Sequence, residues 1–158
     1  MATVTAKRLI RTFQEARQKK SYYQRVREHR AFVPIRYETD DFLVTTAQNG
    51  PELFKVLELR HEVFVAEWQG RRAFHGLDVD AYDFMADHLM IIDKRIQETI
   101  GTYRLLSSHF THNFYSASEF LLGEFMRTPS VKLEMGRACI HPNHRNGNTM
   151  DLLWKGLV

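Results

Sequence analysis

The chain has 158 residues, which is enough for one domain with a substantial core. Its single cysteine, Cys139, excludes an internal disulfide and a zinc site built on several cysteines. No apolar run approaches the roughly 18 residues that span a bilayer, and the basic start of the chain lacks the apolar segment of a secretory signal. We therefore expect a cytoplasmic protein.

The formal net charge of +3 is unevenly distributed along the chain. Residues 7–30 carry nine Lys and Arg against two Glu, a net charge of +7, whereas the rest carries 13 basic and 17 acidic residues, a net charge of −4. A loose apolar stripe within the basic stretch predicts a helix, formed by Leu9, Ile10, Phe13, Ala16 and Val26. Residues 1–33 are thus expected to form a basic arm in front of a folded body over residues 34–158.

The cationic face of this arm allows several interpretations. Through residues 7–30 it could lie on an anionic membrane surface, at the inner face of the membrane, or dock an acidic protein partner. The same charges could contact nucleic acid, although we expect no nucleic-acid partner. The arm could equally be a solvated helix packed on the body, or a partly disordered tail.

Within the body, the first predicted elements are a strand over residues 42–47 and a long helix over residues 49–70. The strand is rich in apolar and β-branched residues. Asn49 is a candidate N-cap of the helix, Pro51 suits its first turn, and Gly70 follows its end. The helix should bury one face, formed by Leu53, Val56, Leu57, Val63 and Phe64.

The second half of the body predicts a β-hairpin, a short helix, a third core strand and a final helix. The hairpin strands cover residues 88–93 and 98–108, with a turn between them. The short helix covers residues 116–126 and has Ser116 or Ser118 as its cap. The core strand covers residues 131–140, and the last helix residues 148–158. This order lacks the strict alternation of strand and helix in a doubly wound parallel sheet, and it favours an α+β fold.

Five stretches of the chain carry a family resemblance: "LRHEVF" (59–64), "DHLMIID" (87–93), "GTYRLL" (101–106), "FYSASEF" (114–120) and "LEMGRACIHPNHRNGNTMDLLWKGL" (133–157). They resemble bacterial ornithine N-acyltransferases, also labelled hemolysin-like, which make the lyso form of ornithine lipids. More distantly, they resemble acyl-homoserine-lactone autoinducer synthases. Both have the Gcn5-related N-acetyltransferase (GNAT) fold, a mixed and mostly antiparallel sheet flanked by helices. The resemblance covers about residues 42–158.

The resemblance implies an N-acyltransferase of lipid biosynthesis. Such an enzyme moves a (3-hydroxy)fatty acyl group from acyl carrier protein (ACP), or from coenzyme A, to the amine of an amino acid, with ornithine as the expected acceptor. The acyl-ACP or acyl-CoA is a co-substrate, and no bound cofactor is expected.

The polar loop between the third core strand and the last helix is the expected site of the acyl donor. A helix N-terminus presents unpaired N–H groups that attract phosphate. The resemblance places the donor phosphate among Ile140, His141, Arg145, Asn146, Gly147, Asn148 and Thr149. The usual acetyltransferase loop has glycines where this chain has Asn148 and Met150, which favours the single phosphate of an ACP arm over the pyrophosphate of coenzyme A. On composition alone, the loop is typical of a solvent-exposed turn.

A second cluster of charged residues is acidic. "LDVDAYDF" places three carboxylates close together, and they repel one another unless cations or a ligand amine offset them. Candidate cations are Arg60, Arg104 and Arg137, two of which fall on core strands, where an arginine needs a partner. The positions that match autoinducer synthases are Arg60, Phe64, Asp78, Asp80, Asp83, Arg104, Glu134 and Arg137. The resemblance implies acceptor binding by Arg60, Phe64, Asp78, Asp83, Glu119 and Phe120; the alternative is a structural ion-pair network that orders the loop.

Acyl transfer to an amine requires a group that takes a proton, because the amine is mostly an ammonium at neutral pH. Glu134 is the first candidate and Asp80 the second, with Arg104 and Arg137 as the other catalytic candidates. A β-bulge near Gly136–Ala138 should supply an N–H group for the oxyanion and bring Glu134 and Arg137 to one face of the sheet.

Two other kinds of chemistry are not expected. Cys139 is predicted to be a buried structural thiol, so we expect no covalent acyl-enzyme. The histidines at positions 88, 141 and 144 form no clear set of three ligands, so we expect no metal site.

The family fold continues with further strands and a helix, so the resemblance implies that this chain holds its N-terminal portion, with the C-terminal part of the fold missing. Two alternatives to an ornithine-type acyltransferase remain. One is a synthase of the acyl-homoserine-lactone type. The other is a truncated, non-catalytic module that binds an acyl carrier or nucleic acid.

Overall fold

The computed structural model describes residues 20–67 and 76–158. At its centre is a five-stranded antiparallel sheet whose strands lie side by side in chain order. The strands are β1 (Arg36–Glu38), β2 (Phe42–Thr46), β3 (Asp87–Asp93), β4 (Glu98–Ser107) and β5 (Leu133–Ile140). The predicted α+β class and the β3–β4 hairpin are confirmed. Strand β1 was not predicted, because its three exposed residues form no apolar pattern.

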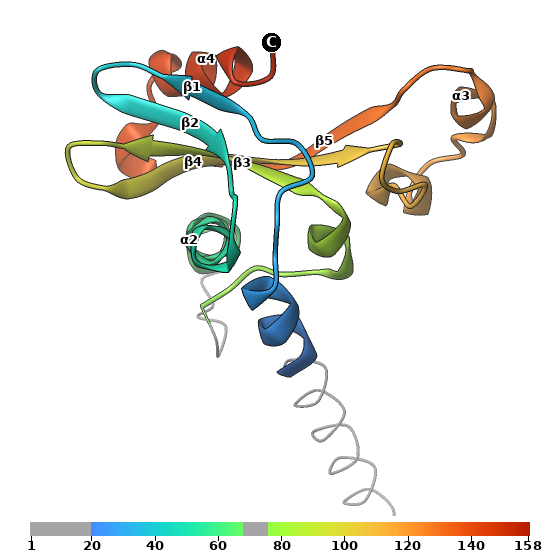
Figure 1. Ribbon diagram of the computed structural model, residues 1–158, viewed down its shortest axis with the longest axis horizontal. Coiled ribbons are helices and arrows are strands. Elements are labelled where there is room, and N and C mark those ends of the chain that lie inside the picture. Colours follow the sequence, from blue (N-terminus) through green and yellow to red (C-terminus); the bar gives the residue numbers. More distant parts are fainter. Residues whose placement is uncertain (1–19, 68–75) are drawn as a thin grey trace, which may run out of the picture.

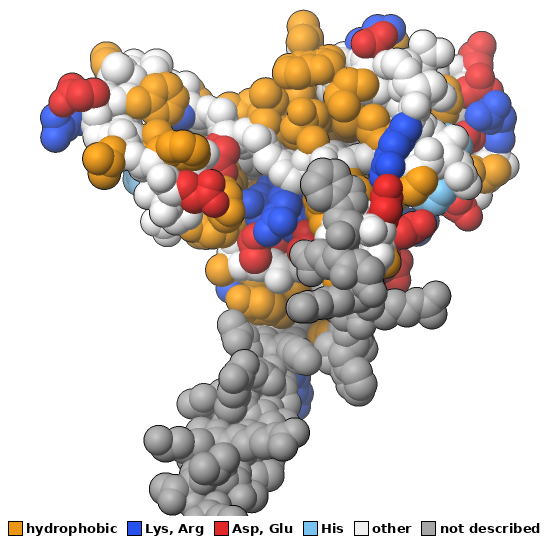
Figure 2. Space-filling view, turned by 180° about the vertical axis from the view of Figure 1, so that it is seen from behind, with side chains coloured by type: hydrophobic (Ala, Val, Ile, Leu, Met, Phe, Trp, Pro, Cys, Tyr) orange, Lys and Arg blue, Asp and Glu red, His pale blue; other side chains and the backbone are white. Residues whose placement is uncertain are grey.

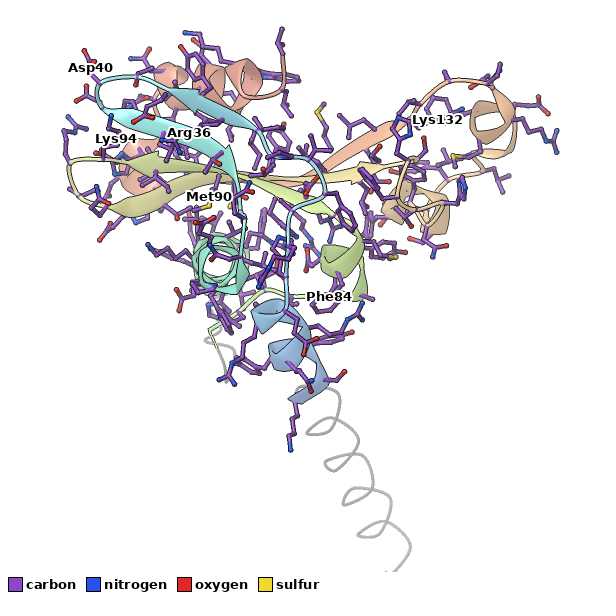
Figure 3. The ribbon with its side chains drawn as sticks, in the orientation of Figure 1. Arg36, Asp40, Phe84, Met90, Lys94 and Lys132 are labelled. Carbon is purple, nitrogen blue, oxygen red and sulfur yellow. The ribbon has the colours of Figure 1, made fainter. Side chains whose placement is uncertain are left out.

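Helices cover both faces of this sheet (Figure 1). One face carries α2 (Gly50–His61), the 3-10 turn η2 (Ala81–Met85) and a helix over residues 20–27, and the other face carries α4 (Gly147–Lys155). Successive side chains of β3 point to opposite faces of the sheet, so the strand contributes to a core on each face. Met90 points toward α2 (Figure 3), whereas Leu89 and Ile91 pack with Leu152 and Leu153 of α4.

The predicted long helix begins as expected and then changes geometry. The Asn49 side chain accepts a hydrogen bond from the Glu52 N–H group at 3.1 Å, so Asn49 is the N-cap of α2. At residue 62 the helix passes into a π-helical segment, η1 (Glu62–Glu67). Such segments are rare and often lie at functional sites. The predicted helix end at Gly70 lies outside the described residues.

The connection between β4 and β5 forms a lobe with two short helical turns, η3 (Tyr115–Ser118) and α3 (Gly123–Arg127). The prediction of one helix over residues 116–126 with a serine cap is therefore wrong. Neither turn has a side-chain cap from its own N-cap residue. Instead, Glu134 of β5 accepts hydrogen bonds from the N–H groups of Tyr115 and Ser116, at 3.2 and 2.8 Å. This cap comes from another element, which local sequence patterns do not reveal.

The basic arm is described from residue 20 onward, and residues 1–19 lie outside the described residues. Residues 20–27 are helical, in line with the predicted helix. Val26 is fully buried in the core cluster that includes Leu53 and Met90. The Arg25 guanidinium lies 3.9 Å from the ring centre of Phe84, which is labelled beside this helix in Figure 3. This part of the arm therefore packs on the body and contributes to its core.

Two further features complete the described fold. A 3-10 turn, η4 (Pro142–His144), connects β5 to α4. Gly156 follows α4 directly against the sheet, where a Cβ atom would come within 2.5 Å of the Val44 side chain, so only glycine allows this close approach. None of the described helices is both long and apolar enough to cross a membrane.

Candidate active site

An ion-pair network joins α2, the acidic loop over residues 78–83, which runs into η2, and strands β4 and β5. Arg60 of α2 is fully buried and pairs with Asp83 (Nη1–Oδ1, 2.6 Å) and Asp78 (Nε–Oδ2, 2.9 Å). Arg104 of β4 donates to both carboxylate oxygens of Asp80 at 2.8 and 2.9 Å, and to Asp83 at 3.2 Å. The predicted pairing of the acidic loop with arginines is therefore confirmed.

Backbone hydrogen bonds fix the acidic loop within this network. Asp80 is the N-cap of η2 and accepts a hydrogen bond from the Tyr82 N–H group at 2.8 Å. Asp83 accepts one from the Asp80 N–H group at 2.7 Å, which completes a capping box. The network thus orders the loop, as the structural alternative required, and this role is compatible with ligand binding beside it.

Part of the network reaches the surface. The side chains of Asp80 and Arg137 are 28% and 34% exposed, whereas Arg60 and Arg104 are buried. Figure 2, which views the molecule from behind Figure 1, shows basic and acidic side chains next to one another at the centre of this face, below an apolar area. A charged ligand can therefore contact the exposed parts of Asp80 and Arg137.

Burial and nearby charges shift the pKa values of Asp83 and His88, at the centre of the network. Burial alone would raise the pKa of the Asp83 carboxyl, but the Arg60 guanidinium beside it outweighs burial and holds that pKa below its usual range. Burial lowers the pKa of His88 to about 4, so its ring is neutral near pH 7. The His88 Nε2–H group donates to the Asp83 carbonyl oxygen at 2.9 Å. His88 therefore supports the acidic loop, a role that sequence reasoning missed because no local motif indicates it.

Strand β5 carries the predicted β-bulge near Gly136. The residue pairs on either side of it, Thr102–Cys139 and Arg104–Gly136, leave two residues of β5 opposite a single residue of β4. The first of these two is Arg137, whose backbone takes the left-handed conformation with φ of 51°. The glycine itself does not have a positive φ, so the strain of the bulge falls on the arginine.

The bulge brings Glu134 and Arg137 to the same face of the sheet, as predicted. The Arg137 Nη2 atom lies 3.2 Å from Asp80, which Arg104 also contacts from that face. Glu134 is paired with Leu106, two residues along β4 from Arg104, and therefore points to the same side. Its carboxylate already accepts the two backbone hydrogen bonds from η3, so Glu134 holds the lobe in place as well as facing the network.

Aromatic rings enclose the two strand arginines. The Arg104 guanidinium carbon lies 5.5 Å from the ring centre of Tyr82 and 6.0 Å from that of Tyr115. The corresponding atom of Arg137 lies 5.9 Å from the ring centre of Phe64, a residue predicted at the acceptor site. Neither tyrosine was predicted as a site residue, although both lie inside the stretches "LDVDAYDF" and "FYSASEF".

A groove of about 440 Å³ runs beside β5, between η1 and the start of α4. Its lining residues are Val63, Phe64, Ala138, Cys139, Ile140, Arg145, Asn146 and Met150. Three predicted donor-site residues, Ile140, Arg145 and Asn146, thus line one groove. Phe64 lines the groove and also lies against Arg137, so the groove and the ion-pair network are neighbours.

Arg145 pairs with a carboxylate that lies far from it in the sequence. Its guanidinium forms a two-pronged ion pair with the carboxylate of Glu67, with distances of 2.7 and 2.5 Å, and its Nε–H group donates to the Ile140 carbonyl at 3.2 Å. The ion pair raises the pKa of Arg145 and lowers that of Glu67. An anion that binds Arg145 must therefore compete with this carboxylate.

The predicted donor-site residues at the start of α4 serve mainly to begin the helix or lie outside the groove. Asn146 is the N-cap of α4 and accepts hydrogen bonds from the N–H and hydroxyl groups of Thr149, which is buried. Gly147 is exposed at the start of α4, and Asn148 lines a different cavity together with Asp151.

His141 also turns away from the groove. Its Nε2 atom lies 3.5 Å from the Glu62 carboxylate, and its ring lines a separate cavity with Glu58. Its Nδ1 atom accepts a hydrogen bond from the Asn143 N–H group at 3.3 Å. His141 was predicted beside the donor phosphate, but these contacts hold it outside the groove.

Glu119, Phe120 and Cys139 differ in how they relate to the network and the groove. Glu119 accepts a hydrogen bond from the Tyr115 hydroxyl at 2.6 Å, which connects it to the edge of the network. Phe120 is 65% exposed on the lobe and lies outside the hydrogen-bonded network. Burial raises the pKa of the Cys139 thiol to about 12, so this thiol is not a nucleophile near neutral pH.

An antiparallel sheet with a bulged strand, a groove beside that strand and a helix N-terminus at the mouth of the groove define an acyltransferase domain of the GNAT type. A family model described as "Acetyltransferase (GNAT) domain" matches residues 59–155, and the chain belongs to this family. Membership of this family implies an acyl donor as co-substrate.

Several L-ornithine N(alpha)-acyltransferases are similar to the chain. Those of Agrobacterium fabrum and Rhizobium meliloti are each 37% identical over 124 residues, which cover 70% of this chain and 42% of the relative. That of Rhodobacter capsulatus is 32% identical over 140 residues, which cover 81% of this chain and 52% of the relative. The chain thus spans about half the length of the curated relatives it matches. No solved structure gives a significant match.

Proposed function

We propose that this chain carries the acyl-transfer site of an N-acyltransferase that moves a fatty acyl group from a carrier-bound thioester to the amine of an amino acid, ornithine above all. One observation carries the proposal. The groove and the ion-pair network lie side by side on β5, with Phe64 in contact with both, so a donor and a charged acceptor would meet at the bulge. The similarity to L-ornithine N(alpha)-acyltransferases supports the choice of acceptor.

The donor is proposed to be acyl-ACP. The apolar lining of the groove suits an acyl chain and a pantetheine arm, and Arg145 with the N-terminus of α4 would hold a single phosphate. Carrier proteins are acidic, so the basic arm over residues 7–30 would serve as a docking element for the carrier. The same arm would attract the enzyme to the anionic inner face of the membrane, which suits a cytoplasmic enzyme whose product is a lipid.

The reaction would be a direct transfer. The amine nitrogen attacks the thioester carbonyl, the tetrahedral intermediate collapses, the C–S bond breaks, and the thiol leaves with a proton while the amide forms. Glu134 is the first candidate to take the amine proton and Asp80 the second. Strand β5 is an edge of the described sheet, so an N–H group of the bulge that points away from β4 would be available to the oxyanion.

Mass spectrometry of the products tests this proposal. The purified chain is incubated with 3-hydroxyacyl-ACP and ornithine, and in parallel with acyl-CoA as donor or with S-adenosylmethionine as acceptor. We expect an N-acyl-ornithine that forms from acyl-ACP. Acyl-homoserine lactone as the product would instead assign an autoinducer-type synthase. Binding of acyl-ACP with no product from any acceptor would assign a non-catalytic acyl-carrier module.

A further inference from the structure

The side chains of the three arginines of the network differ in solvent exposure. The side chains of Arg60 and Arg104 are 1% and 3% exposed, whereas that of Arg137 is 34% exposed. Arg60 uses its Nε, Nη1 and Nη2 atoms for Asp78 and Asp83. Among the described residues, the Arg137 side chain makes one hydrogen bond, from Nη2 to Asp80, and its Nε atom lies 4.0 Å from Asp78. Because a guanidinium has five N–H groups, Arg137 can still take a second anion.

The carboxylates of the acidic loop, by contrast, are already balanced. Three aspartates face three arginines, so the formal charge of the network is zero. The most exposed of them, Asp80, accepts hydrogen bonds from Arg104, Arg137 and the Tyr82 N–H group. An ammonium group could bind there only by displacing an arginine, whereas a carboxylate could bind Arg137 and leave every existing pair in place.

The backbone holds this arginine in an unfavourable conformation. A φ of 51° is costly for any residue with a Cβ atom, and such strain is concentrated at functional sites. The bulge turns the Arg137 side chain onto the face where Phe64 lies 5.9 Å away, and Phe64 lines the donor groove. A group bound to Arg137 would therefore sit next to the place where the proposed donor binds.

We propose that Arg137 binds the α-carboxylate of the acceptor, and that the site thereby selects amino acids over amines that lack a carboxylate. This inference rests on the proposed function and assigns the acceptor's anionic end to one residue. The amine of the acceptor then points toward the bulge and Glu134. Arg60 and Arg104 hold the acidic loop, and the acidic loop in turn positions Arg137 through Asp80.

The first test is a binding measurement that does not depend on turnover. Phenylglyoxal modifies accessible guanidinium groups, and peptide mass spectrometry reports the extent at each arginine. Ornithine should protect Arg137, and 1,4-diaminobutane, which lacks the carboxylate, should not. Arg36, 63% exposed on β1, is the internal reference, and its modification should not change. Equal protection by both compounds, or protection by neither, would overturn the assignment.

The second test uses variants and a selectivity ratio. Wild-type protein should prefer ornithine over 1,4-diaminobutane by roughly 10- to 100-fold, the range of a charged hydrogen bond. Arg137→Gln should reduce this ratio toward one, and so should Arg137→Gly, which suits the positive φ and therefore keeps the fold. Arg127→Gln, on the exposed surface of α3, is the control and should keep the preference. A folded Arg137 variant with the wild-type ratio would overturn the inference.

The two proposals can fail separately. Protection of Arg137 by ornithine, together with no acyl transfer from any thioester, would refute the acyltransferase proposal and leave an amino-acid site at Arg137. Transfer to ornithine without protection of Arg137 would refute the carboxylate assignment alone.

Discussion

At the scale of single residues, the buried His88 makes the folded state sensitive to acid. Burial lowers its pKa to about 4, from a usual value of 6.5. Between these values the unfolded chain binds a proton that the native protein excludes. The free energy of unfolding should therefore fall as the pH drops from about 6.5 toward 4, by roughly 3 kcal/mol. His29, whose pKa is also lowered by burial, acts in the same direction.

Urea denaturation at pH 7 and pH 4.5 measures this effect. His88→Gln keeps a donor for the Asp83 carbonyl but removes the titrating ring, so its loss of stability between the two pH values should be smaller than that of the wild type. His109→Gln removes an exposed histidine and should behave like the wild type. A His88→Gln variant with the full wild-type loss would show that another group causes the acid sensitivity.

The ion pair between Arg145 and Glu67 leads to a second prediction at this scale. A donor phosphate would bind the guanidinium edge that Glu67 now occupies, so the carboxylate competes with it. Glu67→Gln should tighten donor binding by up to about fivefold, the range of exposed ion pairs. Arg145→Ala should weaken it by roughly 10- to 100-fold, because a charged hydrogen bond is lost.

Calorimetric titration with acyl-ACP measures both changes. Glu124→Gln is the matched control, because it removes an exposed carboxylate that pairs with an arginine on α3, away from the groove. Its affinity should equal that of the wild type. If Arg145→Ala bound the donor as tightly as the wild type, Arg145 would have no part in the donor site.

At the scale of elements, the bulge in β5 is the feature that arranges the site, and its strain can be measured. A residue with a Cβ atom in the left-handed region costs roughly 1 kcal/mol more than glycine. Arg137→Gly should therefore be more stable than Arg137→Ala by about that amount, in urea denaturation. At Arg36 in β1, where φ is not positive, the glycine variant should be the less stable one. The same order at both positions would mean that Arg137 is not strained.

Sequence patterns predicted some elements well and others poorly, for physical reasons. The start of α2 was predictable because Asn49 and Pro51 are local signals, and the bulge was expected from the family resemblance and from Gly136 in a core strand. The π-helical end of α2 and the split of the predicted helix over residues 116–126 depend on tertiary contacts. Glu134, which caps η3, lies 18 and 19 residues from the groups it binds.

At the scale of the whole molecule, the pairing of charges was predictable but its details were not. Three carboxylates within "LDVDAYDF", and two arginines on core strands, each required a partner of opposite charge. Which aspartate meets which arginine depends on how η2 packs against the sheet. The pair between Glu67 and Arg145 joins residues 78 positions apart, so no local pattern could indicate it.

The basic arm gives a prediction at the same scale. Deleting residues 1–19 removes five Lys and Arg and one Glu but retains Val26, which is part of the core. The truncated protein should bind acyl-ACP and anionic vesicles more weakly at low salt, and the difference should shrink as salt rises. Deletion through residue 30 would also remove Val26 and is the less informative variant. Equal binding at low salt, with and without residues 1–19, would rule out this role.

The most direct measurement is the rate at which free thiol appears from acyl-ACP, with and without ornithine. The buried Cys139 thiol, with its pKa raised to about 12, should contribute little background to a thiol reagent. We predict release that depends on ornithine, and a fall of roughly 10²–10⁴-fold in Glu134→Gln, with Glu124→Gln unchanged. Near-normal release by Glu134→Gln would move the base to Asp80. Release that is the same with and without ornithine, or no release at all, would contradict acyl transfer at β5.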